Sequence, residues 1–184
     1  GVRRKGREIR GARALVVGRS YRTSARAVLE MRAFFRPFGV SVIDVDLPHF
    51  RGPGAVLHLM SVVSPVDRDL AVVYEPLAPV ALLELLEARG IERLTVDEDE
   101  FERQGSNVLA VGPRRVVAVR GNPKIREKLE RAGASVHEFD GDEVAVKGDG
   151  GPTCLTQPLY RSGESGPPSP SHVLPVATPP LEDR

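Results

Sequence analysis

Short runs rich in Val and Ile alternate with segments of helical spacing from about residue 13 onward. Helices are predicted over 24–35, 79–89 and 122–132, and a glycine follows each of them. Ser24 can cap the first helix, which places Val28, Met31, Phe34 and Phe35 on one face toward a core. The β-branched runs between the helices predict strands. These runs are ARALVVG, VSVIDVD, LHLMSVV, DLAVVYE, IERLTV, NVLAV, RVVAV and ASVHEF. Alternating strands and helices are typical of an α/β domain, which is the fold class we expect.

An internal repeat emerges when the strand starts are aligned, because GPGAVLHL, RQGSNVLA and GGPTCLTQ occupy equivalent places. In this alignment His58, Asn107 and Cys154 coincide, at separations of 49 and 47 residues. If the units surround an axis, these three polar residues converge at the inner ends of the strands. A thiol brought together with an imidazole in this way indicates that Cys154 is a catalytic nucleophile.

The stretch GDGGPTCLTQ presents the chain's single cysteine, and we expect Cys154 at the start of a strand. Gly150 and Gly151 allow the main chain to turn sharply and to pass close to a ligand. Plainer interpretations stay open at each position. Cys154 is then a small core residue, His58 a core histidine bonded to backbone, and Asn107 a structural amide bonded to backbone at a strand start.

Composition limits the classes of protein that fit. The chain has 184 residues, 41% hydrophobic and 28% charged, which suffices for one domain with a core. One cysteine and four scattered histidines give neither a disulfide framework nor metal-ligand spacing, so we expect no metal and no cofactor. No apolar run has the length of a membrane span and no signal peptide is evident, so we expect a cytoplasmic protein with no membrane partner.

Positive charge is concentrated near the amino terminus. Residues 1–36 hold eleven Lys or Arg against two Glu, a net charge of +9 that leaves −8 for the remainder. Nucleic-acid binding is one alternative function for such a basic end. The region lacks interleaved aromatic residues and matches no helix-turn-helix or zinc-finger pattern, which argues against a nucleic-acid partner.

Five stretches of the chain form a recognisable set: VGRSYRT (17–23), LHLMS (57–61), GSNVLAV (105–111), GNPKIREKLERAGASV (121–136) and GGPTCLTQPLYR (150–161). Together they resemble the guanidine-modifying superfamily of dimethylarginine dimethylaminohydrolases, arginine deiminases and amidinotransferases. The resemblance implies an αβ propeller of five units around a central channel, the pentein fold. We therefore expect a partial propeller holding about three of the five ββαβ-type units.

The same resemblance sets the expected domain limits. Residues 1–161 would form the catalytic domain, truncated at its amino terminus relative to the family, and residues 162–184 would form a disordered tail rich in Pro, Ser and Gly. An open arc of units exposes strand edges. A homo-oligomer, or the missing upstream units, would then cover these edges.

By resemblance, Cys154 would be the nucleophile, His58 the general acid and base, and Arg22 the residue that binds the substrate α-carboxylate. Arginine deiminases and amidinotransferases usually place Asp two residues after the histidine, where this chain has Met60. The expected function is therefore hydrolysis of a small guanidine substrate, dimethylarginine, to citrulline and dimethylamine. Arginine deiminase or amidinotransferase activity is the nearest alternative.

The chain departs from the family pattern near its amino terminus. The family's glycine-glycine-aspartate stretch corresponds to KGRE, which places Arg7 near the position of the acid and Glu8 beside it. Glu8 is thus a possible replacement acid, although a solvated charge is the plainer interpretation. A further alternative is a non-catalytic remnant, an interaction module that keeps the fold without the grip on the substrate.

Overall fold

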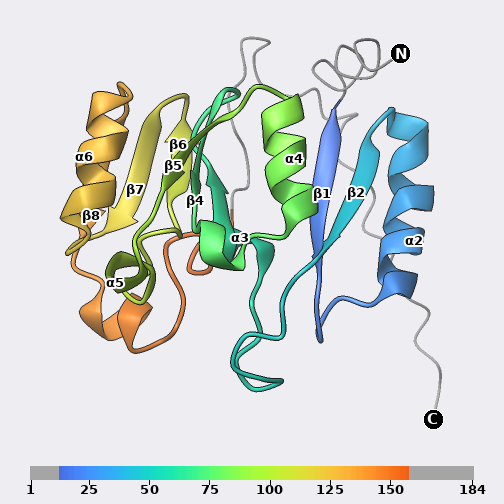
Figure 1. The fold of residues 1–184 in the computed structure, drawn as a ribbon, viewed down its shortest axis with the longest axis horizontal. Helices are drawn as coiled ribbons and strands as arrows, with labels where there is room; N and C mark the ends of the chain where they lie inside the picture. The colour runs from blue at the N-terminus through green and yellow to red at the C-terminus, as the bar shows by residue number, and fades with distance from the viewer. Residues whose placement is uncertain (1–12, 158–184) are drawn as a thin grey trace, which may run out of the picture.

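A computed structural model describes residues 13–157 of the chain. Within this range the chain forms three α/β units that lie side by side, with helix α2 at one end and helix α6 at the other (Figure 1). Each unit joins two parallel strands through a helix, and the second and third units add an antiparallel strand in front. The tail 162–184 and Glu8 lie outside the described residues.

The first unit is a two-stranded parallel sheet with one crossover helix. It contains β1 (Ala14–Arg19), α2 (Ala25–Phe35), the 3-10 turn η1 (Arg36–Phe38) and β2 (Ser41–Asp46). The hydroxyl of Ser24 accepts from the N–H of Ala27 and caps α2, as the sequence predicts.

The second and third units repeat one topology, in which an antiparallel strand pair precedes a parallel crossover. The second unit comprises α3 (Leu59–Val62), β3 (Val63–Pro65), β4 (Leu70–Val73), η2 (Glu75–Leu77), α4 (Val80–Ala88) and β5 (Glu92–Thr95). The third comprises α5 (Glu98–Phe101), β6 (Leu109–Gly112), β7 (Arg115–Val119), α6 (Pro123–Arg131), β8 (Ser135–Phe139) and the π-helical turn η3 (Asp142–Val146). The repeat read from the sequence is thus present in the sheet topology.

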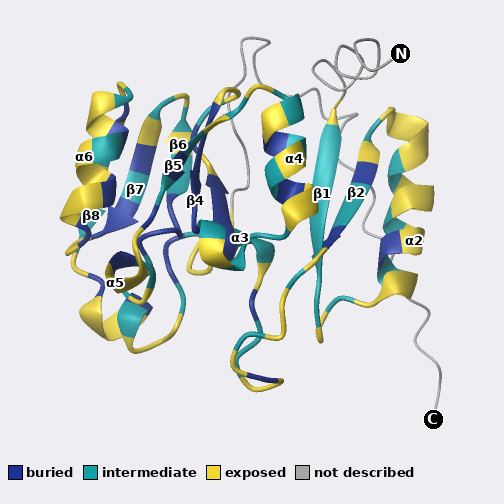
Figure 2. Cartoon of the chain, in the orientation of Figure 1, coloured by how far each residue is buried: buried dark blue, intermediate teal, exposed yellow. Residues whose placement is uncertain are grey.

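Two hydrophobic clusters hold the units together. The larger cluster packs the second sheet against the third unit and includes Leu70, Val72, Leu94, Val116, Ile125 and Leu129. The smaller cluster joins α4 and the other face of β4 to the first unit and includes Val45, Val63, Ala71, Val73, Leu82 and Leu86. Figure 2 shows β4 buried along its length, whereas the outer face of α2 is exposed. Phe34, expected on the core-facing side of α2, is 53% exposed, so that prediction was wrong.

Buried serines connect the second unit to the third. The Ser64 hydroxyl donates to the carbonyl of Ser106 at 2.7 Å and accepts from the N–H of Val108 at 3.0 Å. In the opposite direction, the Ser106 hydroxyl donates to the carbonyl of Ser61 at 2.7 Å. Because buried polar groups are costly unless they are paired, these reciprocal bonds fix the relative position of the two units at the level of their first strands.

A buried carboxylate caps helix α6. Glu100 in α5 is 3% exposed and accepts from the backbone N–H groups of Lys124 at 2.7 Å and Ile125 at 2.9 Å. These N–H groups belong to the first turn of α6, where no carbonyl within the helix can serve them, and the negative charge also complements the helix dipole. Neither α5 nor this cap was predicted from the sequence.

We expect Glu100→Ala to lower the free energy of unfolding by about 1–3 kcal/mol, because two buried N–H groups lose their acceptor. Urea unfolding followed by circular dichroism measures this change. Glu98→Ala is the matched control, since Glu98 lies in the same short helix but is exposed, and it should change stability by less than about 0.5 kcal/mol. Equal effects of the two substitutions would contradict the capping role.

Candidate active site

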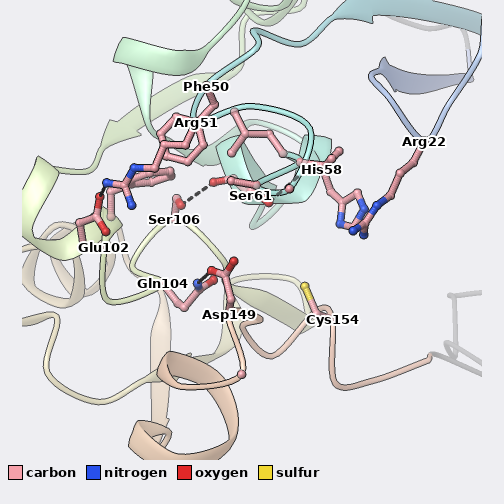
Figure 3. A pocket seen from close by; sticks show the side chains of 16 residues that line it. Arg22, Phe50, Arg51, His58, Ser61, Glu102, Gln104, Ser106, Asp149 and Cys154 are labelled. Carbon is pink, nitrogen blue, oxygen red and sulfur yellow. Dashed lines mark hydrogen bonds and ion pairs between the residues drawn. The ribbon is translucent and has the colours of Figure 1, made fainter.

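One pocket of about 330 Å³ brings together residues from all three units. Its size lies at the lower end of the range typical of small-molecule sites. The polar side chains on its walls are Arg22, Arg51, His58, Ser61, Glu102, Gln104, Ser106, Asp149 and Cys154. Figure 3 shows the Cys154 sulfur pointing into the pocket, with His58 and Arg22 together on another part of the wall. The pocket therefore contains three of the four site residues that the sequence predicts.

His58 immediately precedes helix α3. Its backbone N–H donates to the hydroxyl of Ser61 at 3.3 Å, and the Ser61 N–H returns a bond to the His58 carbonyl at 2.9 Å. The predicted strand over 57–63, which included His58, was wrong, because the chain turns into α3 at Leu59 and becomes a strand only at Val63. Two local bonds to one serine decide the helical turn. The imidazole is exposed to the pocket instead of being buried in the core.

Cys154 lies in a turn after η3, and not at the start of a strand as predicted. Its N–H donates to the carbonyl of Gly151 at 3.0 Å, which closes the turn and leaves the side chain exposed. A Cβ atom on Gly151 would lie 2.5 Å from Cγ of Asn107, so only glycine fits at this close approach. The expectation that the glycines let the chain pass close to other groups is thereby confirmed at Gly151.

Asn107 forms hydrogen bonds with the turn that carries Thr153 and Cys154, the cysteine turn. It is 1% exposed, and its Oδ1 atom accepts from the N–H of Thr153 at 3.0 Å and from the Thr153 hydroxyl at 2.7 Å. Its Nδ2 atom donates to Sγ of Cys154 at 3.3 Å. The repeat alignment correctly brings Asn107 to Cys154, but His58 and Cys154 line the pocket whereas the buried Asn107 does not. The backbone bond expected of a structural asparagine is present, and the bond to sulfur is additional.

Arg22 extends from the loop between β1 and α2, and its guanidinium reaches the wall on which His58 lies (Figure 3). Its backbone N–H is held by the Ser20 hydroxyl at 3.3 Å. Glu8, the possible acid, lies outside the described residues.

Asp149 is a pocket residue that was not predicted from the sequence. It adopts a left-handed backbone conformation, with φ of 52°, and its carboxylate accepts from Nε2 of Gln104 at 3.4 Å. A non-glycine residue in this conformation is uncommon and is often associated with function. The signal in the sequence was GDGG, whose acidic residue stands five positions before the cysteine.

An ion pair lines the far side of the pocket. Nη2 of Arg51 donates to Oε1 of Glu102 at 2.5 Å, and the Arg51 guanidinium lies 4.9 Å above the ring of Phe50. Behind them, burial and then the negative charges of Glu98 and Glu102 raise the pKa of Tyr74, so its phenol stays neutral at physiological pH. This side of the site therefore carries one full charge of each sign.

Among residues 13–157, no group of three or more His, Cys, Asp or Glu side chains is arranged to hold a metal ion. No helix in that same range is long and apolar enough to cross a bilayer.

Comparison with known proteins identifies the superfamily. The family model described as arginine deiminase matches residues 81–161. An uncharacterized protein from Bacillus subtilis, YkgA, is 27% identical over 79% of this chain and 48% of its own length. An arginine deiminase from Listeria welshimeri is 35% identical over 51% of this chain and 23% of its own. The chain thus spans at most about half the length of these relatives.

Solved structures show the same relationship. A mutant dimethylarginine dimethylaminohydrolase from Pseudomonas aeruginosa, complexed with citrulline, is 25% identical with a TM-score of 0.63, over 77% of this chain and 50% of that one. The amidinotransferase SxtG from Microseira wollei shares the fold at 16% identity, with a TM-score of 0.68 over 83% of this chain and 46% of its own. The chain belongs to the superfamily of guanidine-modifying enzymes that includes arginine deiminases and amidinotransferases. Within it, the chain resembles the dimethylarginine dimethylaminohydrolases.

We expect Asn107→Asp to slow alkylation of Cys154 by about tenfold or more. The substitution is nearly isosteric and keeps the acceptor for Thr153, but it replaces the N–H donor to sulfur with a negative oxygen, which disfavours the thiolate. The measurement is the rate of adduct formation by intact-protein mass spectrometry at constant pH. Asn122→Asp is the control, because Asn122 is also buried but bonds to Arg103 and Val119. Rates that fall equally in both variants would contradict a role for the bond to sulfur.

Proposed function

We propose that this chain carries the catalytic centre of a hydrolase that cleaves a C–N bond in the guanidine group of a substituted arginine. One observation carries the proposal: Cys154, His58 and Asp149 line a single pocket, with Arg22 on the same surface. A nucleophile, an acid and base, an anion for the guanidinium and a cation for a carboxylate are the groups that this reaction requires. Dimethylarginine, giving citrulline and dimethylamine, is the substrate that the sequence motifs favour.

The reaction would begin with attack of the Cys154 thiolate on the guanidinium carbon. His58 would protonate the nitrogen of the departing amine as the C–N bond breaks, leaving an S-linked thiouronium. His58 would then take a proton from water, which attacks the same carbon and expels the thiolate. The products are the free amine and a ureido group, which is citrulline when the substrate is an arginine derivative. The N–H of Asn107 would stabilise the thiolate at both ends of this cycle.

Asp149 is the candidate for holding the guanidinium. Its carboxylate lies on the pocket wall and is held by Gln104, and carboxylates bind guanidinium groups through short, charge-assisted hydrogen bonds. Such a contact contributes on the order of 1.5–3 kcal/mol. In this proposal Asp149 supplies the negative charge for which Glu8 was the candidate in the sequence.

The choice of a substituted arginine over arginine rests on Met60. The side chain two positions after His58 contributes no carboxylate, and Met60 lines a different cavity, with Pro65 and Val108. The position two residues after His58 therefore supplies no acid to the pocket. Deimination of arginine remains the alternative to be assayed in parallel.

We expect 2-chloroacetamidine, a cationic amidine electrophile, to add once to the full chain. The adduct should be absent in Cys154→Ser and should form about 100-fold more slowly in His58→Ala, because the acid and base contributes at least that factor. Intact-protein mass spectrometry measures the adduct, and citrulline release from dimethylarginine and from arginine is assayed alongside. Equal labelling of all variants, or neither labelling nor citrulline release by the wild-type chain, would contradict the hydrolase. Either result would favour a non-catalytic module of the same fold.

A neutral electrophile of similar size provides the control for charge. Asp149→Asn should reduce labelling by chloroacetamidine much more than labelling by iodoacetamide, since only the amidine carries a positive charge. Asp140→Asn, at an exposed residue paired with Arg120, should change neither rate.

We further propose that the three units are part of a pentein propeller in which residues 1–161 form the catalytic domain. The topological repeat and the resemblance to superfamily structures support this arrangement. Open sheet edges favour association, so we expect the isolated chain to sediment as an oligomer or to require further propeller units. Analytical ultracentrifugation across a concentration series measures this property. A single species with the mass of one 20.0 kDa chain at all concentrations would contradict the proposal.

A further inference from the structure

The pocket has a second end that carries an arginine, Arg51, which the reaction described above does not use. Arg22 and Arg51 lie at opposite ends of the pocket, with Cys154 and Asp149 along the wall between them (Figure 3). The end near Arg51 also contains Phe50, Phe101 and Glu102. It therefore combines two aromatic rings with one ion pair.

This end is held in place by aromatic packing. Phe50 has φ of 54°, a strained conformation for a bulky residue, and its ring meets Phe101 edge to face at 6.3 Å. Phe101 in turn stacks on the buried ring of Tyr74 at a centroid distance of 3.8 Å. The strained backbone at Phe50 is thus stabilised by a stack that reaches the hydrophobic core, and Arg51 follows directly from it.

Arg51 retains hydrogen-bonding capacity toward the pocket. A guanidinium offers five N–H donors. Among the described residues, the ion pair of Arg51 with Glu102 uses only the Nη2 atom. Exposed ion pairs contribute little to the free energy of unfolding. Stability therefore does not explain why a strained turn directs the Arg51–Glu102 pair into the pocket. The remaining donors suit a planar carboxylate, which arginine binds through two parallel bonds.

We propose that the Arg51 end is a subsite for a leaving amine that carries a carboxylate, so that the substrate is an arginine whose guanidine nitrogen bears a carboxyalkyl group. The inference rests on the proposed function, because it requires the guanidinium carbon to lie at Cys154 and the α-carboxylate at Arg22. The second nitrogen substituent then points toward Phe50 and Arg51. The methylene groups of this substituent lie against the Phe50 and Phe101 rings, and its carboxylate meets Arg51.

The chemistry balances without any additional reactant. The C–N bond to the carboxyalkyl amine breaks, its electron pair stays on nitrogen, and His58 supplies the proton. An amino acid leaves, and water completes the ureido product on the other side. Dimethylamine fits this end less well, because its methyl groups would displace water from Arg51 and Glu102 without supplying a hydrogen bond.

The test compares two arginines whose nitrogen substituents have similar size but different charge, Nω-carboxymethyl-L-arginine and Nω-propyl-L-arginine. Binding is measured by calorimetry on the full chain carrying Cys154→Ser, so that neither ligand is consumed. We expect the carboxymethyl ligand to bind at least about tenfold more tightly. Adding Arg51→Gln should bring the ratio to about one, Arg22→Gln should weaken both ligands by the same factor, and Arg120→Gln should leave the ratio unchanged.

A ratio near one with Arg51 present, a preference that survives Arg51→Gln, or no binding of either ligand would each overturn the subsite. The proposed function fails separately. If the wild-type chain releases no citrulline from either ligand although the Arg51-dependent preference is present, the subsite stands and hydrolysis does not. If the wild-type chain releases citrulline but binds the carboxymethyl and propyl ligands with equal affinity, hydrolysis stands and the subsite does not.

Discussion

The burial of β4 on both faces is the constraint on which the rest of the molecule depends. Leu70 and Val72 enter the larger cluster with the third unit, and Ala71 and Val73 enter the smaller cluster with the first. A strand with alternating side chains can serve two cores only if it is apolar at every position, and this one is. Each hydrophobic core therefore positions its units relative to the same four residues. The pocket is lined by residues from all three units, so its geometry depends on the position of this strand.

Buried polar groups translate that packing into a chemical site. The Ser64 and Ser106 hydroxyls join the second and third units, and Ser61 links this joint to the backbone of His58. One residue beyond Ser106, Asn107 binds the cysteine turn. The imidazole and the thiol thus come from segments almost a hundred residues apart. The same short set of hydrogen bonds between the second and third units nevertheless positions the backbone next to both groups. Such networks specify a geometry only when every member is paired.

Much of this could be predicted from the sequence, and the exceptions have physical causes. Strand and helix alternation, the Ser24 cap and the repeat that aligns His58 with Cys154 follow from local patterns, and the superfamily follows from motifs. The helical turn after His58 could not be predicted, because LHLMSVV has the composition of a strand and two bonds to Ser61 reverse that preference. Asp149 was missed because its position on the pocket wall depends on a left-handed backbone angle, which sequence periodicity does not encode.

The first unit differs from the other two in how firmly it is anchored. Every residue of β1 is only half-buried, and the unit meets the rest of the described chain through the smaller cluster. Amide hydrogens in β1 and β2 are therefore expected to exchange with solvent through local openings of lower free energy than those of β4 and β7. Arg22 lies on this unit. Part of the binding free energy of a ligand that contacts Arg22 would therefore be offset by the ordering of this unit. Substitutions in the first unit would then change the affinity for the ligand without any change near the sulfur of Cys154.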